Sequence, residues 1–211
     1  LANIAGIPMV IRVLQGVSGQ VDRAVAATDD GRIAEAVESA GFQAVITEEA
    51  ESGTQRVMLA WKKMGSPSGT IVNVQGDEPL VKGDWIRRLT AHPPSSNEVF
   101  TLARPIGRKE ALSPDRVKAV VDTSGRALYF SRSPIPHGAS TFLKHIGVYC
   151  FSPESLKRCV SCGRTSLSRT EDLEQLAWLE AGLNINIIQG DFVSIGVDTP
   201  EDLERAAEYF K

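Results

Sequence analysis

The sequence predicts an α/β fold in which helices cover both faces of a mixed, mostly parallel sheet. Apolar runs with strand character alternate with helical patterns along much of the chain, and one pair of runs is joined by a short turn, as in a hairpin. The clearest strand runs through residues 70–75 and stops at a glycine, two carboxylates and a proline. We therefore expect a three-layer α/β/α domain in which this strand opens into a site.

The length of the chain predicts a single domain, and its net charge argues against some classes of binding partner. The 211 residues are 42% hydrophobic, which is enough for one sizeable core, so we expect a single domain over residues 1–211. A formal net charge of −3 argues against a nucleic acid or an anionic membrane bound by bulk charge. No apolar run has the length of a bilayer span, and the first residues lack the pattern of a signal peptide. We expect a soluble, cytoplasmic protein.

Three cysteines are few for this length, and their odd number fits a reducing compartment. Cys159 and Cys162 have the spacing of a zinc or redox motif. No second such pair and no pair of histidines completes a metal site, so we expect free thiols.

The first third of the chain predicts two strand–helix units. Asp30 is placed to cap one helix, which Gly41 would end, and Ser52 to Gln55 has the spacing of a capping box at the start of the next. The expected elements are a loop at 1–8, a helix from Met9 to about Gly16, strands at 21–28 and 44–47, and helices at 30–41 and from Ser52 onward.

The rest of the chain adds an antiparallel hairpin and ends in a helix. A Thr-Ser-Gly turn separates the apolar runs at 117–122 and 127–130, which favours a hairpin over a crossover. Thr199 and Pro200 have the residue types of a helix cap and a first helical position. The further expected elements are helices at 85–91, 171–181 and 200–210, strands at 99–106, 142–151 and 184–188, and an apolar strand-like run at 193–197.

Two corners of the sequence share one pattern, an apolar run followed by glycine, aspartate and proline. They place Asp77 and Asp198 at the ends of expected strands, where open α/β sheets bind ligands. Mg²⁺ usually takes one or two carboxylates together with phosphate and water oxygens, so these two residues could hold it. As alternatives, Asp77 lies in an ordinary turn and Asp198 is only a residue before a capped helix.

Several stretches in a fixed order carry a family resemblance over the whole chain, which resembles the 3-deoxy-manno-octulosonate cytidylyltransferases, or CMP-Kdo synthetases. Members activate an acidic eight-carbon sugar (Kdo) with CTP for lipopolysaccharide. The resemblance implies a Rossmann-like, glycosyltransferase-A-like nucleotidyltransferase fold. The stretches are Ala27–Asp30, Ser52–Arg56, Val72–Pro79, Ala127–Arg132, Phe142–Tyr149, Leu173–Leu176 and Gly196–Pro200.

The resemblance also implies which residues bind CTP and the metal. Backbone N–H groups and hydroxyls at a helix start could meet cytidine or phosphate oxygens. Gln75 and Asp77 resemble the substrate and metal contacts, and Asp198 the second metal carboxylate. The residues implied for the nucleotide side are Asp29, Ser52, Gly53, Thr54 and Arg56.

On the acceptor side, the period of two places His145 and Tyr149 on one face of a strand, with Gly147 leaving room for a sugar. The resemblance adds Glu174 and Gln175 as contacts to sugar hydroxyls, and Arg132 as a partner for the sugar's carboxylate. Each assignment has a structural alternative. His145 could be hydrogen-bonded within the protein, Glu174 and Gln175 could be polar residues on an amphipathic helix, and Arg132 could be solvated.

The chain departs from the family at two places. The family's first strand and its triphosphate-binding loop would precede Leu1, so we expect further residues there, or a gap beside the strand that ends at Gln75. The connection at 134–141 is shorter than the family usually has, and residues near His137 are a second candidate gap. Residues 114–150 would form a hairpin extension at the subunit contact of a homodimer.

The reaction implied is attack of the sugar's anomeric hydroxyl on the α-phosphate of CTP, with Mg²⁺ on Asp77 and Asp198 and no protein nucleophile. Positioning by Gln75 and the other contacts would supply the remaining catalysis. Two alternatives stay open: a cytidylyltransferase for another acidic sugar such as sialic acid, and a catalytically silent nucleotide-sugar binding protein.

Overall fold

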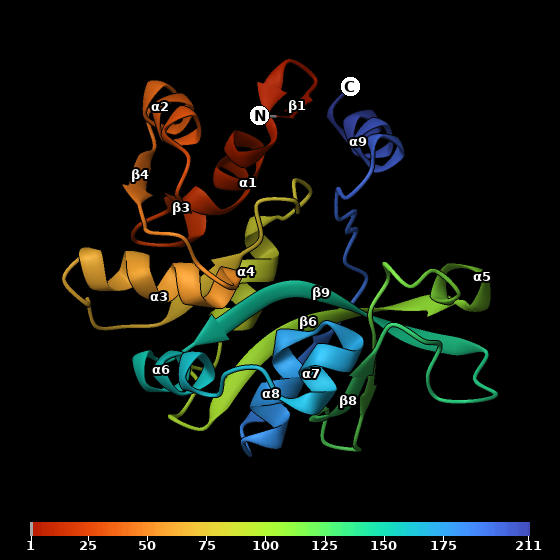
Figure 1. Cartoon of the computed structure of the whole chain (residues 1–211). Helices are drawn as coiled ribbons and strands as arrows, with labels where there is room; N and C mark the ends of the chain where they lie inside the picture. Colours follow the sequence, from red (N-terminus) through yellow and green to blue (C-terminus); the bar gives the residue numbers. More distant parts are fainter. Residues whose placement is uncertain (1) are drawn as a thin grey trace. The chain divides into compact units, whose positions relative to one another are not determined.

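The computed structural model describes residues 2–211, and Figure 1 shows the course of the chain. The chain forms two compact units. Unit 1 comprises residues up to Pro67, residues 73–88 and residues 193–211, whereas unit 2 comprises residues 68–72 and 89–192. The predicted α/β class with a mixed, multistranded sheet is confirmed.

Unit 1 is formed by a parallel strand pair and the helices around it. The caps predicted at Asp30, Ser52 and Thr199 are confirmed, since each side chain accepts a hydrogen bond from a backbone N–H of the following helix. Its elements are β1 (Asn3–Ile4), β2 (Ile7–Pro8), α1 (Met9–Val17), β3 (Val25–Thr28), α2 (Gly31–Ser39), β4 (Gln43–Ile46), α3 (Gly53–Lys63), α9 (Pro200–Ala207), two 3₁₀ turns (Ser18–Gln20 and Glu208–Phe210) and most of α4 (Gly83–Thr90).

Three expectations for unit 1 are wrong in detail. Residues 3–8 form a small antiparallel hairpin rather than a loop, because Ala5 and Gly6 adopt positive φ angles of 48° and 77° and reverse the chain. The strand expected at 21–28 is limited to β3, which pairs only with β4. The run at 193–198 is not a strand at all.

Two apolar clusters stabilise unit 1. In the first, Ile11 and Leu14 of α1 pack with Ala26 of β3 and Val37 of α2. The second joins the ends of the described chain and contains Ile4, Leu80, Ile195 and Ala206. The second cluster therefore brings the segment after Asp77 and the segment before Asp198 into one core.

Unit 2 is built on a six-stranded sheet in the order β10-β6-β9-β7-β8, with β5 (Ile71–Val74), whose first two residues belong to this unit and whose last two belong to unit 1, also paired to β9. β6 runs parallel to β10 and antiparallel to β9, and β7 is antiparallel to both β8 and β9. The parallel share is thus smaller than the sequence predicted, although the hairpin β7–β8 is confirmed. The strands are β6 (Glu98–Gly107), β7 (Lys118–Val121), β8 (Ala127–Ser131), β9 (Thr141–Phe151) and β10 (Asn184–Gln189).

The helices of unit 2 differ from the prediction at one place that matters for the site. The helix expected at 171–181 begins only at Glu174, because Asp172 adopts the left-handed conformation with φ 52° and ψ 52°, and a further helix that was not expected ends at Glu171. Figure 1 shows these two helices, α7 and α8, over one face of the sheet. The helices are α5 (Arg108–Ala111), α6 (Pro153–Ser161), α7 (Ser166–Glu171) and α8 (Glu174–Glu180).

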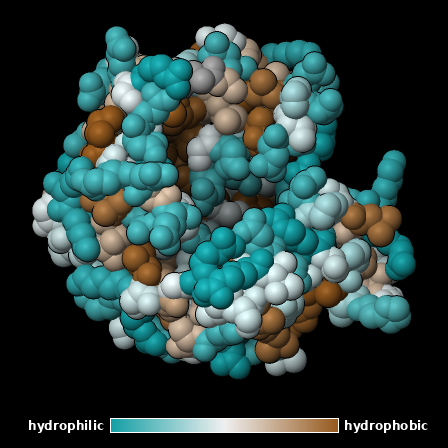
Figure 2. All heavy atoms as spheres, viewed as in Figure 1, coloured by the Kyte–Doolittle hydropathy of each residue, from teal (hydrophilic) through white to brown (hydrophobic). Residues whose placement is uncertain are grey.

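The surface and the thiols agree with the composition. On the face drawn in Figure 2, hydrophilic residues predominate and hydrophobic ones are scattered among them. Within residues 2–211, no helix combines the length and the hydropathy that a membrane span requires. The three cysteines are free, as expected, and Cys150 and Cys159 are buried.

Candidate active site

Asp77 and Asp198 come together in unit 1 through a backbone hydrogen bond. The carbonyl of Asp77 accepts from the N–H of Val197 at 2.9 Å, so the residue after Val197 adjoins the Asp77 loop. The pKa of Asp77 is raised, mainly by burial and further by the negative charge of Asp198. Two carboxylates that are far apart in the sequence are therefore close enough to influence each other.

A second contact fixes the same two segments. Glu78 is 6% exposed, and its carboxylate oxygens accept from the Ser194 hydroxyl at 3.1 and 2.9 Å. Ser194 itself is 4% exposed. Sequence reasoning missed both residues, although a serine at a buried position of an apolar run was a signal, since buried polar groups need partners. The run at 193–198 is thus held by these contacts in place of strand pairing.

The two aspartates offer the ligand type that Mg²⁺ prefers. Within residues 2–211, no group of three or more His, Cys, Asp or Glu side chains has the arrangement of a metal site. Mg²⁺ does not need such a group, because it commonly binds through one or two carboxylates plus substrate phosphates and water. The residues present therefore fit a magnesium ion that binds together with a triphosphate.

The helix start at Ser52 and the end of β5 also meet within unit 1. A side chain added to Gly53 would place its Cβ 3.0 Å from Nε2 and 3.1 Å from Oε1 of Gln75. Glycine at position 53 thus lets the Gln75 amide lie against the first turn of α3. Ser52 accepts from the N–H of Gln55 at 3.2 Å, whereas Thr54 is 1% exposed. Of the expected nucleotide contacts, Thr54 is therefore the least accessible.

Arg56 links this turn to the loop after β3. Its guanidinium donates to Asp29 at 2.7 Å and to the Thr47 hydroxyl at 3.0 Å. The hydrogen bond from Arg56 lowers the pKa of Asp29. Unit 1 therefore contains two contacts among the residues predicted for the nucleotide side, Asp29 with Arg56 and Gly53 with Gln75.

His145 and Tyr149 belong to unit 2 and form part of an aromatic cluster. Their ring centroids lie 5.4 Å apart, so they share a face as predicted, and Trp178 of α8 meets the Tyr149 ring edge-on at 5.1 Å. A shift in register opposite Thr101 and Leu102 interrupts the regular period of β9 between the two residues. The side chains are 8% and 3% exposed, so at most their edges are open to a ligand.

Burial also fixes the charge state of His145. The Thr101 hydroxyl lies 2.8 Å from the carbonyl of Val148 and 3.2 Å from that of Ile146, and a carbonyl can only accept, so we assign the hydroxyl hydrogen to these carbonyls and Nε2 of His145 as the donor in its 3.0 Å contact with Thr101. Burial lowers the pKa of His145 to about 3. The ring is therefore neutral at ordinary pH.

Glu174 and Gln175 begin helix α8, close to Tyr149. Burial raises the pKa of Tyr149 well above its usual value, and the negative charge of Glu174 contributes. Gln175 is 3% exposed. Among the residues predicted for the acceptor side, unit 2 thus places Glu174 near Tyr149 and Tyr149 beside His145, with Gln175 next to Glu174 on α8.

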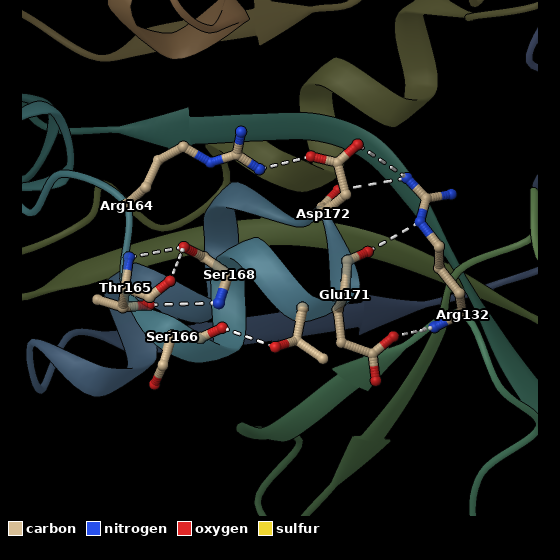
Figure 3. A network of polar contacts seen from close by, with 8 residues as sticks. Arg132, Arg164, Thr165, Ser166, Ser168, Glu171 and Asp172 are labelled. Atoms are coloured by element: carbon tan, nitrogen blue, oxygen red, sulfur yellow. Dashed lines mark hydrogen bonds and ion pairs between the residues drawn. The ribbon is translucent and has the colours of Figure 1, made fainter.

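The expectation for Arg132 is not supported. Its guanidinium donates from Nε to the carbonyl of Glu171 at 2.8 Å, from Nη2 to that of Asp172 at 3.2 Å and from Nη1 to that of Pro114 at 3.3 Å. Figure 3 shows the first two of these contacts. The N–H donors of the Arg132 guanidinium are thus hydrogen-bonded to main-chain carbonyls. Arg132 therefore stabilises unit 2 and is not directed at a sugar carboxylate.

Known proteins share this fold and these motifs. The model of a family described as cytidylyltransferase matches residues 1–185. The 3-deoxy-manno-octulosonate cytidylyltransferase of Porphyromonas gingivalis is 39% identical over 227 residues, which cover 100% of this chain and 89% of that protein. The enzyme of the same name from Anaeromyxobacter sp. strain Fw109-5 is 40% identical over 213 residues, covering 98% and 87%.

Solved structures agree. The structure of CMP:2-keto-3-deoxy-manno-octonic acid synthetase complexed with CTP is 34% identical, has a TM-score of 0.86 and covers 100% of this chain and 90% of its own. HddC from Yersinia pseudotuberculosis has a TM-score of 0.73 at 14% identity, covering 100% and 88%, which shows likeness of fold alone. The paired aspartates, the glycine turn and this fold define a nucleotidyltransferase. The chain belongs to the 3-deoxy-manno-octulosonate cytidylyltransferase family of enzymes, as the motifs indicated.

Proposed function

We propose that this chain transfers CMP from CTP to the anomeric hydroxyl of Kdo, releasing pyrophosphate and forming CMP-Kdo for lipopolysaccharide synthesis. The observation that supports the proposal is the hydrogen bond from the Val197 N–H to the Asp77 carbonyl, because it links the segments that carry Asp77 and Asp198. Relatives with these motifs are named for the same reaction.

In the proposed reaction the acceptor oxygen forms a bond to the α-phosphorus of CTP. The bond from that phosphorus to the bridging oxygen breaks, and pyrophosphate leaves with the bonding electrons. The hydroxyl proton passes to solvent or to a phosphate oxygen, since no side chain is assigned as a general base. Ser52, Gly53, Gln75 and Arg56 would orient the nucleotide, so that most of the catalysis comes from positioning.

Asp77 and Asp198 are the residues that would hold Mg²⁺ in this scheme. When bound, the ion supplies neutralisation of phosphate charge and a lower pKa for the attacking hydroxyl. The family points to a divalent metal, and we propose magnesium because both side chains are hard oxygen donors. The hydrogen bonds of Ser194 and Val197 link the segments that carry the two carboxylates, which supports this assignment.

On the acceptor side, we propose that Glu174 and Gln175 bind hydroxyls of Kdo while Tyr149 and His145 form the wall beneath them. The support is their grouping around the start of α8 and the effect of Glu174 on the pKa of Tyr149. A sialic acid would be the alternative acceptor, because it is also an acidic sugar with a free anomeric hydroxyl.

The test is pyrophosphate release from CTP and Mg²⁺ with Kdo, with sialic acid and without an acceptor. Release that depends on Kdo supports the proposal, whereas release with sialic acid alone reassigns the acceptor. If CTP binds by calorimetry but neither sugar yields pyrophosphate, the chain is a nucleotide-sugar binding protein without activity. A matched control is Asp191→Asn, which removes an exposed carboxylate in the connection before Val193 and should leave the rate unchanged.

The proposal includes a cellular setting and an assembly. The free thiols fit a reducing compartment such as the cytoplasm. We propose that residues 1–211 act as one nucleotidyltransferase domain and that residues 114–150 form the subunit contact of a homodimer. Sedimentation equilibrium would give a mass of twice that of one chain, and a monomer at micromolar concentration would refute the dimer.

A further inference from the structure

Helix α7 gives way to helix α8 at a junction of five residues of unit 2, which we name the α7–α8 junction: Lys118, Ser131, Arg132, Glu171 and Asp172. Glu171 is its centre, and its carboxylate accepts from the Ser131 hydroxyl at 2.7 Å and from the backbone N–H of Arg132 at 2.8 Å. Figure 3 shows this carboxylate directed at the backbone nitrogen of Arg132. The last residue of α7 therefore holds the end of strand β8.

The side chain of Arg132 bonds back to the same helix end. Its guanidinium donates to the carbonyls of Glu171 and Asp172, which have no helical partner where α7 stops. Asp172 is left-handed, and its carboxylate pairs with Arg164 at 2.5 Å on the exposed rim. The Glu171 carboxylate bonds the end of β8 and the Arg132 guanidinium bonds the end of α7, so hydrogen bonds in both directions fix the break between α7 and α8, without any need for the exposed ion pair.

Lys118 adds a buried charge to the junction. Its side chain is 0% exposed, and Nζ donates to the carbonyls of Arg132 at 2.5 Å and Ser113 at 3.0 Å. Burial lowers the pKa of Lys118, and the negative charge of Glu171 opposes that shift. Glu171 therefore also supplies negative charge near the buried ammonium group of Lys118. Removing the charge of Glu171 should destabilise the fold, because the ammonium group would then be buried with less counter-charge.

The junction decides where α8 begins. Only Leu173 separates Asp172 from Glu174 and Gln175, the first two residues of α8, and Trp178 one turn later packs on Tyr149. A slip of one residue at the break would turn both side chains by about 100° around the helix axis and move them by about 1.5 Å. The direction of the two proposed acceptor contacts thus depends on contacts that neither residue makes itself.

We propose that Glu171 is a positioning residue for the sugar acceptor, which fixes the start of α8 by bonding Ser131 and Arg132 and so aims Glu174 and Gln175. This inference rests on the proposed function, because it assumes that these two residues bind the acceptor. Glu171 itself contacts no substrate in this scheme.

The experiment is steady-state kinetics of Glu171→Gln in the full chain, with CTP and Kdo varied separately. Glutamine keeps one acceptor oxygen but loses the charge, so the KM for Kdo should rise about tenfold, as expected for loss of a charged hydrogen bond. The KM for CTP should stay within about twofold, because the nucleotide residues lie in unit 1. Glu171→Asp keeps the charge on a shorter side chain and should recover part of the loss.

Two further variants keep the inference falsifiable. Arg164→Gln removes only the exposed ion pair of the same network and should leave both KM values unchanged. If Glu171→Gln does not fold, Ser131→Ala removes one partner of the carboxylate at smaller cost and should raise the KM for Kdo selectively. Equal effects on both substrates, or a lower melting temperature with unchanged KM values, would overturn the positioning role. A wild-type chain that releases no pyrophosphate with Kdo would instead refute the proposed function.

Discussion

Lowering the pH should destabilise the folded chain through His145. The pKa of this residue is about 3 in the folded chain, against 6.5 as its ordinary value. Because the folded pKa is depressed, the unfolded state alone binds a proton between these values, and stability falls as the pH drops below 6.5. From about pH 7.5 to about pH 5.5, the ratio of protonated to neutral unfolded chains rises from about 0.1 to about 10, which amounts to about 1.4 kcal/mol.

The assay is chemical denaturation of the wild-type chain and of His145→Gln at both pH values. The glutamine amide can still donate to the Thr101 hydroxyl but binds no proton, so the variant should lose about 1.4 kcal/mol less on acidification. His92 and His137 are present in both proteins, so their contributions cancel in the comparison. An identical pH dependence of the two proteins would refute the assignment of a neutral, buried His145.

The remaining predictions concern the two substrates and the metal. Asp198→Asn should change the free energy of unfolding by less than about 1 kcal/mol, yet raise the Mg²⁺ concentration needed for half-maximal turnover and remove most activity; normal magnesium dependence would contradict the two-carboxylate site. Gly53→Ala should raise the KM for CTP about tenfold by displacing Gln75, with the KM for Kdo as the control. Tyr149→Phe should raise the KM for Kdo about tenfold and that for CTP little; equal effects on both KM values, or an effect on thermal stability alone, would leave Tyr149 a core residue.

Local chemistry made part of the site predictable from the sequence. Helix caps depend on one side chain and the next few backbone groups, so Asp30, Ser52 and Thr199 could be assigned without a fold. The residue types of the glycine and the carboxylates after β5 likewise indicated a ligand site without knowledge of the fold. Each of these predictions concerned groups a few positions apart in the chain.

The parts that the sequence did not predict depend on distant partners. The run at 193–198 has the alternation of a strand, but a strand needs a neighbour, and here Ser194 and Val197 bond the loop of Asp77 and Glu78 instead. The break at Asp172 likewise depends on Arg132, which is 40 residues away in the sequence. Periodicity describes which faces are apolar, and it contains no information on these pairings.

The contacts around Asp77 explain why Asp198→Asn should remove the charge at position 198 and leave the side chain in the same place. Two carboxylates close together repel, and the raised pKa of Asp77 reflects that repulsion as well as burial. Their approach is therefore held by other bonds, from the Val197 N–H to the Asp77 carbonyl and from Ser194 to Glu78. None of these bonds involves the side chain of Asp198, so asparagine at position 198 should occupy the same place, and any loss of activity can be assigned to the missing charge. The proposed magnesium site requires such an arrangement, because carboxylates held together by other bonds attract a cation that lowers their repulsion.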